Sequence, residues 1–535
     1  MNAAHARAWL VALASLVSVA CGAGPLFQDA PPVWQVDDDR DIAEPHERDF
    51  DRTEYYARIY FAERIDRALQ LPDEEPAWNT NSYDEVPDST WFQNRIGART
   101  ITPAEAANGP LHGPAPEPPF DIVSGKLGGG TPGALIEDHL GRKFLVKLDT
   151  RANPELHSAA GAIVNRIFWT LGYNVPEDQV FELRRDQLHI KRGATYKNAL
   201  KDKVPFEQAN VDAILGHGPP PRHGVYRALA SRLLEGKPMG GFPRTGARAD
   251  DPNDTVPHQH RRELRGLRVF AAWVGHTDMK EDNTLDMFVE RGNAHFLRHY
   301  LVDFDAALNE HAVEMDRPED GWEYFVDWPA QTKATLAFGL WKRPWEEVKP
   351  TPWPSVGSFS AQPFDPRAWH ETYPYAPFAE MDDADAYWAA KLVMRFDRPL
   401  LEAIVAQGRL SEPRAASYLV DTLLARRDAI GREFLDAVTP LDDFSLEHGA
   451  LCMTDLAVYY RLAKPGVIEW LNGSRVLATR VESAGGRICT KLKATDAYTV
   501  FRLRVRRGDA PRPPIELHFK AGSQARLLGV LRVAR

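Results

Sequence analysis

The spacing of apolar residues in the middle of the chain predicts three short strands followed by a helix. Residues 120–124, 134–137 and 143–148 are short apolar runs bounded by turn residues, which is the pattern of β-strands. A glycine-rich loop separates the first two runs. The helix is expected to begin at Asn153-Pro154-Glu155, a typical helix start, and to end at Gly172, because apolar residues recur between them at helical intervals.

The second half of the chain predicts helices first and strands afterwards. A long helix is expected at residues 258–275, and further helices at 383–395, 399–407 and 411–438. From residue 446 to residue 535, apolar residues alternate with polar ones, and Gly-containing turns separate the runs. This last pattern predicts a small β-sandwich.

Two segments before the first strand differ from the rest in composition. Residues 21–47 are polar, acidic and contain proline, which predicts a flexible tether. Residues 48–119 form an N-terminal extension, in which a helix is expected at 53–71 and a Pro-rich stretch marks the end.

Residues 1–20 have the pattern of a signal peptide. His5 and Arg7 precede an apolar run that is long enough for an export signal and too short to span a bilayer. The run ends at Cys21 and resembles a bacterial lipoprotein signal, in which Cys21 would become the lipidated first residue. That resemblance implies an exported protein, lipid-anchored in the bacterial cell envelope at the outer membrane or the periplasmic face. The alternative is an ordinary secretory peptide, cut close to Cys21.

Composition indicates a globular protein of several domains and argues against nucleic acid as its main partner. The chain has 535 residues, of which 44% are hydrophobic and 26% charged, and its formal net charge is −10. Nucleic-acid binding requires a basic surface, which this charge disfavours. Cys452 and Cys489 lie in the strand-rich region, and export would permit a disulfide between them; two buried thiols are the alternative.

The residues that carry chemistry are concentrated directly after the helix expected at 258–275. Asp278, Lys280 and Asn283 follow it in close succession. A strand, a turn and a second strand come next, and they end at Asp303-Phe304-Asp305. Phosphoryl transfer needs a carboxylate facing the acceptor hydroxyl, a cation beside the γ-phosphate and oxygen ligands for magnesium. One loop and the end of one strand pair could bring all of these together.

This order of residues resembles the protein kinase superfamily, whose HxDxKxxN catalytic loop precedes a metal-binding DFG. The resemblance implies that Asp278 is the catalytic base and that Lys280 contacts phosphate. It also implies that Asn283 and Asp303 bind Mg²⁺ or Mn²⁺. DFD stands here in place of DFG, which is closer to atypical members of the superfamily, and Asp305 is either a third metal ligand or a helix N-cap.

Residues upstream extend the resemblance. Gly128-Gly129-Gly130 lies in the loop that would cover the phosphates of ATP, and Lys147 on the third strand matches the phosphate-binding lysine. That lysine is expected to pair with a glutamate in the following helix, whose one acid is Glu155 in the first turn. His276 is expected to brace the catalytic loop rather than to act as an acid or a base.

The resemblance implies an α+β, two-lobed protein-kinase-like fold with an N-terminal helical extension and a C-terminal β-sandwich. Residues 120–257 would be the strand-rich lobe with an insert, residues 258–440 the helical lobe, and residues 446–535 the sandwich. The implied activity is an ATP- and Mg²⁺-dependent phosphotransferase, held at the membrane through Cys21 and acting on an unidentified hydroxyl acceptor. A catalytically inactive scaffold for envelope protein partners and a metal-dependent phosphoester hydrolase are the alternatives.

Overall fold

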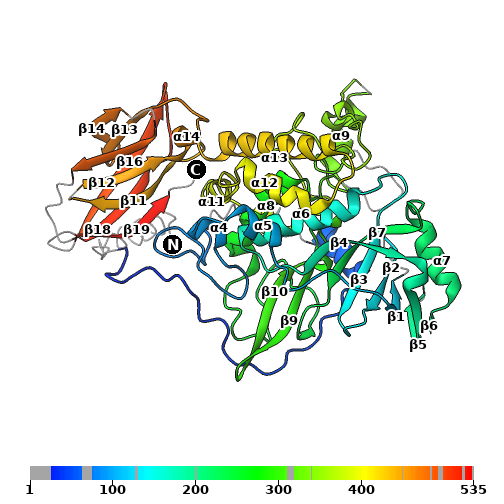
Figure 1. Cartoon of the computed structure of the whole chain (residues 1–535). Helices are drawn as coiled ribbons and strands as arrows, with labels where there is room; N and C mark the ends of the chain where they lie inside the picture. Colours follow the sequence, from blue (N-terminus) through cyan, green and yellow to red (C-terminus); the bar gives the residue numbers. More distant parts are fainter. Residues whose placement is uncertain are drawn as a thin grey trace, which may run out of the picture.

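The computed structural model describes residues 26–62, 75–126, 131–198, 202–309, 319–338, 340–448, 450–481, 485–491, 498–520 and 525–532. It is a mixed α/β structure, and within these ranges it has sheets of seven, three, three and six strands (Figure 1). The predicted signal peptide, Cys21 and Gly128-Gly129-Gly130 lie outside the described residues. None of the described helices has the length and apolar character that crossing a membrane requires.

The seven-stranded sheet contains the three strands predicted at its start. Its strands are β1 (Phe120–Lys126), β2 (Gly133–Glu137), β3 (Lys143–Leu148), β4 (Glu177–Arg184), β5 (Leu188–Lys197), β6 (Lys203–Pro205) and β7 (Val225–Arg232). They are ordered β4-β7-β3-β2-β1-β5-β6, so β3 lies inside the sheet. The predicted helix is α6 (Leu156–Leu171), which packs on this sheet through Ala162 against Val180 and Leu229. The insert that forms β5, β6 and α7 (Gln208–His217) was not predicted in detail from the sequence.

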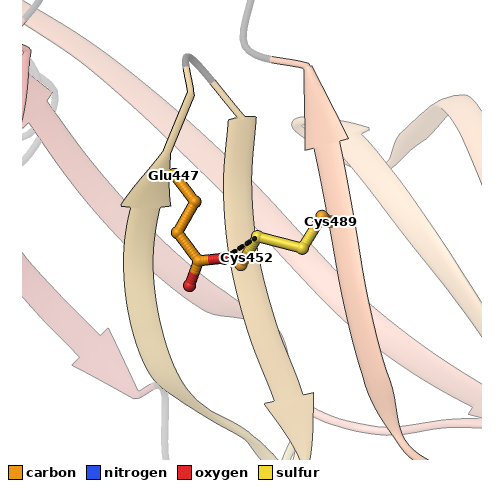
Figure 2. A group of neighbouring side chains, drawn as sticks. All are labelled: Glu447, Cys452 and Cys489. Atoms are coloured by element: carbon orange, nitrogen blue, oxygen red, sulfur yellow. Dashed lines mark hydrogen bonds between the residues drawn. A yellow bond between two sulfur atoms is a disulfide. The ribbon is translucent and has the colours of Figure 1, made fainter.

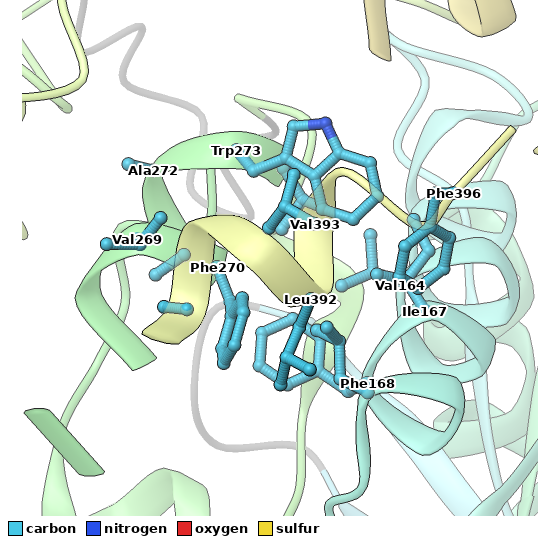
Figure 3. Packing of buried hydrophobic residues seen from close by; sticks show 14 of the residues in the cluster. Val164, Ile167, Phe168, Val269, Phe270, Ala272, Trp273, Leu392, Val393 and Phe396 are labelled. Carbon is cyan, nitrogen blue, oxygen red and sulfur yellow. The ribbon is translucent and has the colours of Figure 1, made fainter. Parts of the chain in front are cut away.

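Helices make up the other half of the central region, around one large apolar cluster. The predicted helices are α8 (Arg262–Val274), α11 (Asp383–Val393), α12 (Arg398–Val405) and α13 (Pro413–Phe434). Figure 3 shows Phe168 of α6 in the same cluster as Phe270 and Trp273 of α8 and Leu392 of α11. Because α8 is buried along nearly its whole length, the position of its C-terminal end is fixed by packing.

A strand pair follows α8, as the sequence predicts. β9 (Thr284–Arg291) pairs antiparallel with β10 (Ala294–Leu301), and β8 (Lys237–Pro238) pairs with β9. The helix expected at 53–71 appears as α2 (Arg52–Ala57) and the π-helical turn η1 (Arg58–Ala62), and the rest of that range lies outside the described residues. The other short elements are α4 (Arg95–Ala98), α5 (Pro103–Asn108), η2 (Arg185–Gln187), η3 (His258–His260), η4 (Glu281–Asn283), η5 (Phe304–Ala306), α9 (Trp328–Leu336), η6 (Pro344–Glu347), α10 (Ala376–Ala379), η7 (Ala406–Gly408) and α14 (Leu456–Tyr459).

Strands dominate the C-terminal part, beginning at Leu441 rather than at residue 446. One sheet contains β11 (Leu441–Glu447), β12 (Ala450–Asp455) and β15 (Arg487–Lys491); the other contains β13 (Val467–Asn472), β14 (Arg475–Val481), β16 (Tyr498–Arg507), β17 (Ala510–Pro511), β18 (Ile515–Lys520) and β19 (Arg526–Arg532). Both sheets contribute to one apolar cluster, for example through Met453 and Leu517. The alternation of apolar and polar residues along these strands therefore arises because one face of each sheet is buried.

A disulfide joins Cys452 of β12 to Cys489 of β15 (Figure 2). The two cysteines are direct partners in the antiparallel pairing of these strands, which brings their side chains together. Glu447 lies beside them, with its Oε2 3.5 Å from the sulfur of Cys452. Both sulfurs are bonded to each other in the disulfide, so Glu447, Cys452 and Cys489 do not form a metal site. Of the two alternatives for the cysteines, a disulfide or two buried thiols, the structure has the disulfide.

The prediction of a flexible tether at residues 21–47 is wrong for the part that the structure describes. Asp38 accepts hydrogen bonds from the backbone N and the hydroxyl of Thr90, at 2.9 and 2.8 Å. Asp29 forms an ion pair with Lys520 of β18, at 2.5 Å. The acidic residues that indicated a solvated spacer are instead the partners of groups on the body, and such long-range pairing leaves no periodic signal in the sequence.

Ion pairs, most of them buried, connect the N-terminal extension, the helices and the C-terminal sheets. Arg262 of α8 contacts Asp84 and, through Nε, lies 3.0 Å from Oδ1 of Asp385 in α11. The other oxygen of Asp84 lies 3.1 Å from Nε of Arg532 in β19. Arg532 continues the series to Asp442 in β11, at 3.3 Å. The three parts of the chain therefore share one network of charges, which we call the interdomain ion-pair network.

Candidate active site

The loop that follows α8 begins at a helix end fixed by packing. Gly275 ends α8 with φ of 63°, a left-handed conformation that favours glycine. His276 comes next and is 1% exposed, with its ring 5.9 Å from that of Phe304. Burial lowers the pKa of His276 to about 4, so the ring is neutral at physiological pH. These contacts are those of a residue that braces the loop, as expected from the sequence.

Asp278, Lys280 and Asn283 form a closed set of contacts on this loop. Nζ of Lys280 lies 2.9 and 2.8 Å from the two carboxylate oxygens of Asp278. Nδ2 of Asn283 donates to the backbone carbonyl of Asp278 at 2.7 Å and to its Oδ2 at 3.0 Å. Burial would lower the pKa of Lys280, but the adjacent carboxylate of Asp278 outweighs it and the pKa is raised. The carboxylate of Asp278 is therefore held in place by Asn283, beside the positively charged Lys280.

The β9–β10 hairpin returns the chain to the same place. The strands pair in continuous register from Arg291 and Ala294 at the turn to Thr284 and Leu301 at the open end. The backbone N of Val302 then donates to the carbonyl of Asn283 at 3.0 Å. Asn283 and Asp303 are thus neighbours in space, because each residue of one strand of the hairpin lies opposite a residue of the other strand.

Lys147 of β3 meets both acids of the DFD sequence. Its Nζ contacts Oδ1 of Asp303 and lies 2.7 Å from Oδ2 of Asp305. Burial beside Asp305 raises the pKa of Asp303. Burial also acts to raise the pKa of Asp305, but His157 and Lys147 together hold it well below its usual range. The result is a compact cluster of carboxylates around one cation, with Asp303 the more exposed acid at 34% of its side chain.

The expected pairing of Lys147 with Glu155 is not found. Glu155 precedes the first residue of α6, where it accepts a hydrogen bond from the backbone N of Ser411 at 2.9 Å and lies 3.5 Å from Arg222. Its left-handed backbone conformation, with φ of 74°, places it outside the regular turns of the helix. A role for Glu155 in holding Lys147 is therefore not supported by the geometry.

A residue of α6 contacts the cluster in place of Glu155, namely His157. It lies in the first turn of α6, is fully buried, and its Nε2 is 2.7 Å from Oδ2 of Asp305. Lys147 is therefore linked to α6 through Asp305 rather than directly. The signal that could have found His157 is an ionisable residue in the first turn of a helix whose residues are mostly apolar, but that signal names no partner.

Asp178 of β4 is a second residue that the sequence did not single out. It is 2% exposed and accepts a hydrogen bond from the hydroxyl of Ser231 on the neighbouring strand β7, at 2.5 Å. Burial raises the pKa of Asp178 to about 7, although the nearby Lys147 acts in the opposite direction. The seven-stranded sheet thus contains, close to Lys147, an acid that is partly protonated near neutral pH.

Replacing Asp178 with asparagine is expected to stabilise the protein increasingly as pH rises. The folded-state pKa of about 7 exceeds the ordinary value of 3.8, so the folded state keeps a proton that the unfolded state loses. The protonated carboxyl of Asp178 therefore contributes stability that is lost as pH rises from about 4 to about 7. The amide of asparagine does not titrate, so the variant does not lose stability from this position over that range. Melting temperatures at about pH 4 and about pH 8 test this. A matched Asp186→Asn change, at a side chain 70% exposed, should give no such trend; equal gains at both pH values in Asp178→Asn would contradict the prediction.

The described residues that flank the glycine loop lie at the same cluster. Burial lowers the pKa of Lys126 at the end of β1, and Lys147 lowers it further, while Asp303 and Asp305 act against both. The residue that leads into the loop is thus within electrostatic reach of the lysine and both acids. Gly128-Gly129-Gly130 itself is outside the described residues.

No protein-family model matches the chain, and no curated protein matches it. Among solved structures, the Golgi casein kinase is similar over 58% of this chain and 76% of that chain, with 9% identity and a TM-score of 0.23. A similarity at this level carries no inference about the chain.

Proposed function

We propose that this protein is an ATP- and Mg²⁺-dependent phosphotransferase with a two-lobed, kinase-like central region. The observation that carries the proposal is the contact of Lys147 with Asp303 and Asp305. These groups come from a sheet strand and from the end of a hairpin, 156 and 158 positions apart. Bringing a lysine to the DFD acids in this way is what phosphate and metal binding at a kinase-like site requires.

The residues of the cluster suit a magnesium ion. Magnesium prefers oxygen ligands and is usually bound by one or two carboxylates together with phosphate oxygens. Asp303 supplies a carboxylate, and Asn283, whose Nδ2 is committed to Asp278, would supply its Oδ1. When bound, the ion would neutralise phosphate charge. Lys147 already holds a positive charge between Asp303 and Asp305, so the cluster accommodates a cation.

Each protein group has a role that follows from its contacts. Asp278 would orient the acceptor hydroxyl and receive its proton, and the ammonium of Lys280 contacts both of its carboxylate oxygens. Lys147 would exchange its contact with Asp303 for phosphate oxygens of ATP. Asp305, which contacts His157, would keep Lys147 directed toward the phosphates, the role that a helix glutamate has in the protein kinases that the sequence resembles.

The remaining parts of the chain complete the proposal. The N-terminal signal and Cys21 would place the protein at the cell envelope through a lipid anchor. The two C-terminal sheets, which share one apolar cluster, would form a β-sandwich held to the catalytic region by the interdomain ion-pair network.

A catalytically inactive scaffold is the second candidate. The observation that favours it is the absence of a contact between Lys147 and Glu155 among the described residues, since the lysine–glutamate pair marks active kinases. Such a protein would bind envelope partners, with or without nucleotide.

A thermal-shift experiment with ATP, with and without Mg²⁺, tests the nucleotide site. ATP with Mg²⁺ should stabilise the wild-type protein by about 2.7 kcal/mol when ATP is roughly 100-fold above its Kd. Lys147→Met should lose this shift, because the phosphates lose their cation. Lys143→Met, on the same strand at an exposed position, should keep it. No shift in the wild-type protein, or equal shifts in both variants, would remove the basis of the proposal.

A further inference from the structure

Aromatic side chains gather on the surface beside the loop that contains Asp278. Tyr56 and Tyr60 come from the N-terminal extension, whereas Phe325 and Tyr373 come from the long connection between the hairpin and α11. The ring centroids of Tyr56 and Tyr373 are 5.4 Å apart, and those of Phe325 and Tyr373 are 6.0 Å apart. Tyr60 closes the group, at 6.2 Å from Tyr56 and 6.5 Å from Phe325. We call these four residues the aromatic wall.

Contacts with the catalytic loop fix the position of the aromatic wall. Nζ of Lys280, which binds the carboxylate of Asp278, lies 6.0 Å from the centroid of the Tyr373 ring. Arg58, which lies between Tyr56 and Tyr60 in the chain, forms an ion pair with Glu281 at 2.5 Å. The N-terminal extension is thereby held against the loop, one side chain away from the proposed base.

The rings of the aromatic wall remain accessible to solvent. Phe325 is 52% exposed, and Tyr56, Tyr60 and Tyr373 are half-buried. By contrast, Phe168 in the interior is fully buried. A group of partly exposed rings next to a reactive carboxylate has the character of a binding surface rather than of a core.

We propose that the aromatic wall binds the ring of a neutral sugar and presents one of its hydroxyls to Asp278, so that the acceptor is a glycan. This inference rests on the proposed function and specifies its substrate class. Aromatic rings offer a flat apolar face to the C–H side of a sugar.

The charges near the aromatic wall favour a neutral acceptor. Lys280 is paired with Asp278, and Arg58 with Glu281. A peptide recognised by its acidic or basic side chains would have to compete for these pairs. A neutral sugar would not have to displace these ion pairs, because its hydroxyls need only hydrogen-bonding partners.

The transfer step balances with ATP as the donor. The sugar hydroxyl oxygen forms a bond to the γ-phosphorus, and the bond from that phosphorus to the oxygen bridging to the β-phosphate breaks. The hydroxyl proton passes to the carboxylate of Asp278. The products are ADP and a sugar phosphate.

The test measures transfer from labelled ATP, with Mg²⁺, by the full chain to neutral oligosaccharides and to Ser/Thr-containing peptides. Oligosaccharides should be labelled. Tyr373→Ala should raise the KM for the oligosaccharide by about tenfold or more, the loss of one stacking contact, while the KM for ATP changes by less than about twofold. Tyr373→Phe keeps the ring and should restore most of the affinity. Tyr459→Ala, at a tyrosine of α14 that is 58% exposed, is the matched control and should change neither KM.

The outcomes separate this inference from the proposed function. Labelling of peptides without oligosaccharides would overturn the glycan acceptor and leave the phosphotransferase intact. A thermal shift with ATP and Mg²⁺ but no transfer to either acceptor would also overturn it. Absence of both the shift and the transfer would instead reject the proposed function. If Tyr373→Ala does not fold, Phe325→Ala, at a more exposed ring, makes the same test.

Discussion

Replacing Asp278 with asparagine is expected to reduce transfer of phosphate from ATP by roughly 10²- to 10⁴-fold, the range that one general base contributes. An amide has nearly the shape of a carboxylate but cannot accept the acceptor proton. The side chain of Asp278 is 27% exposed, so an acceptor hydroxyl can reach it. Initial rates with labelled ATP, measured for wild type and variant at equal protein concentration, give the ratio directly.

Asp282→Asn is the matched control for this prediction. Asp282 belongs to the same loop and carries the same charge, but it is exposed, whereas Asp278 is enclosed by Lys280 and Asn283. The control should therefore retain the wild-type rate, and both variants should melt close to the wild-type temperature. Undiminished transfer by Asp278→Asn would show that another group receives the proton.

Replacing Arg262 with methionine is expected to destabilise the protein by about 3 to 5 kcal/mol, the cost of removing one partner of a buried ion pair. Arg262 is 2% exposed, and it contacts both Asp84 and Asp385. Methionine fills much of the volume but leaves Asp385, which is fully buried, with one fewer cation. The contact of Arg262 with Asp84, which also binds Arg532, would be lost at the same time.

Urea unfolding, with the free energy extrapolated to water, measures this effect. Arg398→Met is the control, because Arg398 pairs with Asp421 at the surface with half of its side chain exposed. Such pairs contribute about 0 to 1 kcal/mol. A loss in Arg262→Met no greater than in Arg398→Met would mean that the interdomain ion-pair network does not hold the parts of the chain together.

The sequence by itself determined the elements that carry the site. The strands at 120–124 and 143–148, the helix that ends before His276, and the following strand pair all occur where their patterns predict them. Their apolar periodicity is a local property of the chain, so it can be recognised without knowledge of the tertiary contacts. The spacing of Asp278 and Asn283 also placed both on one loop, and the structure brings them within hydrogen-bonding distance.

Only the tertiary structure decided which groups meet. It linked Lys147 to Asp305 and His157 instead of Glu155, paired Cys452 with Cys489, and packed the acidic N-terminal segment against the body. It also placed Tyr56 and Tyr373 in contact. The reason is physical: periodicity reports which face of an element is buried, whereas the partner of a polar side chain is set by elements distant in the chain, whose relative positions the packing of the whole molecule decides.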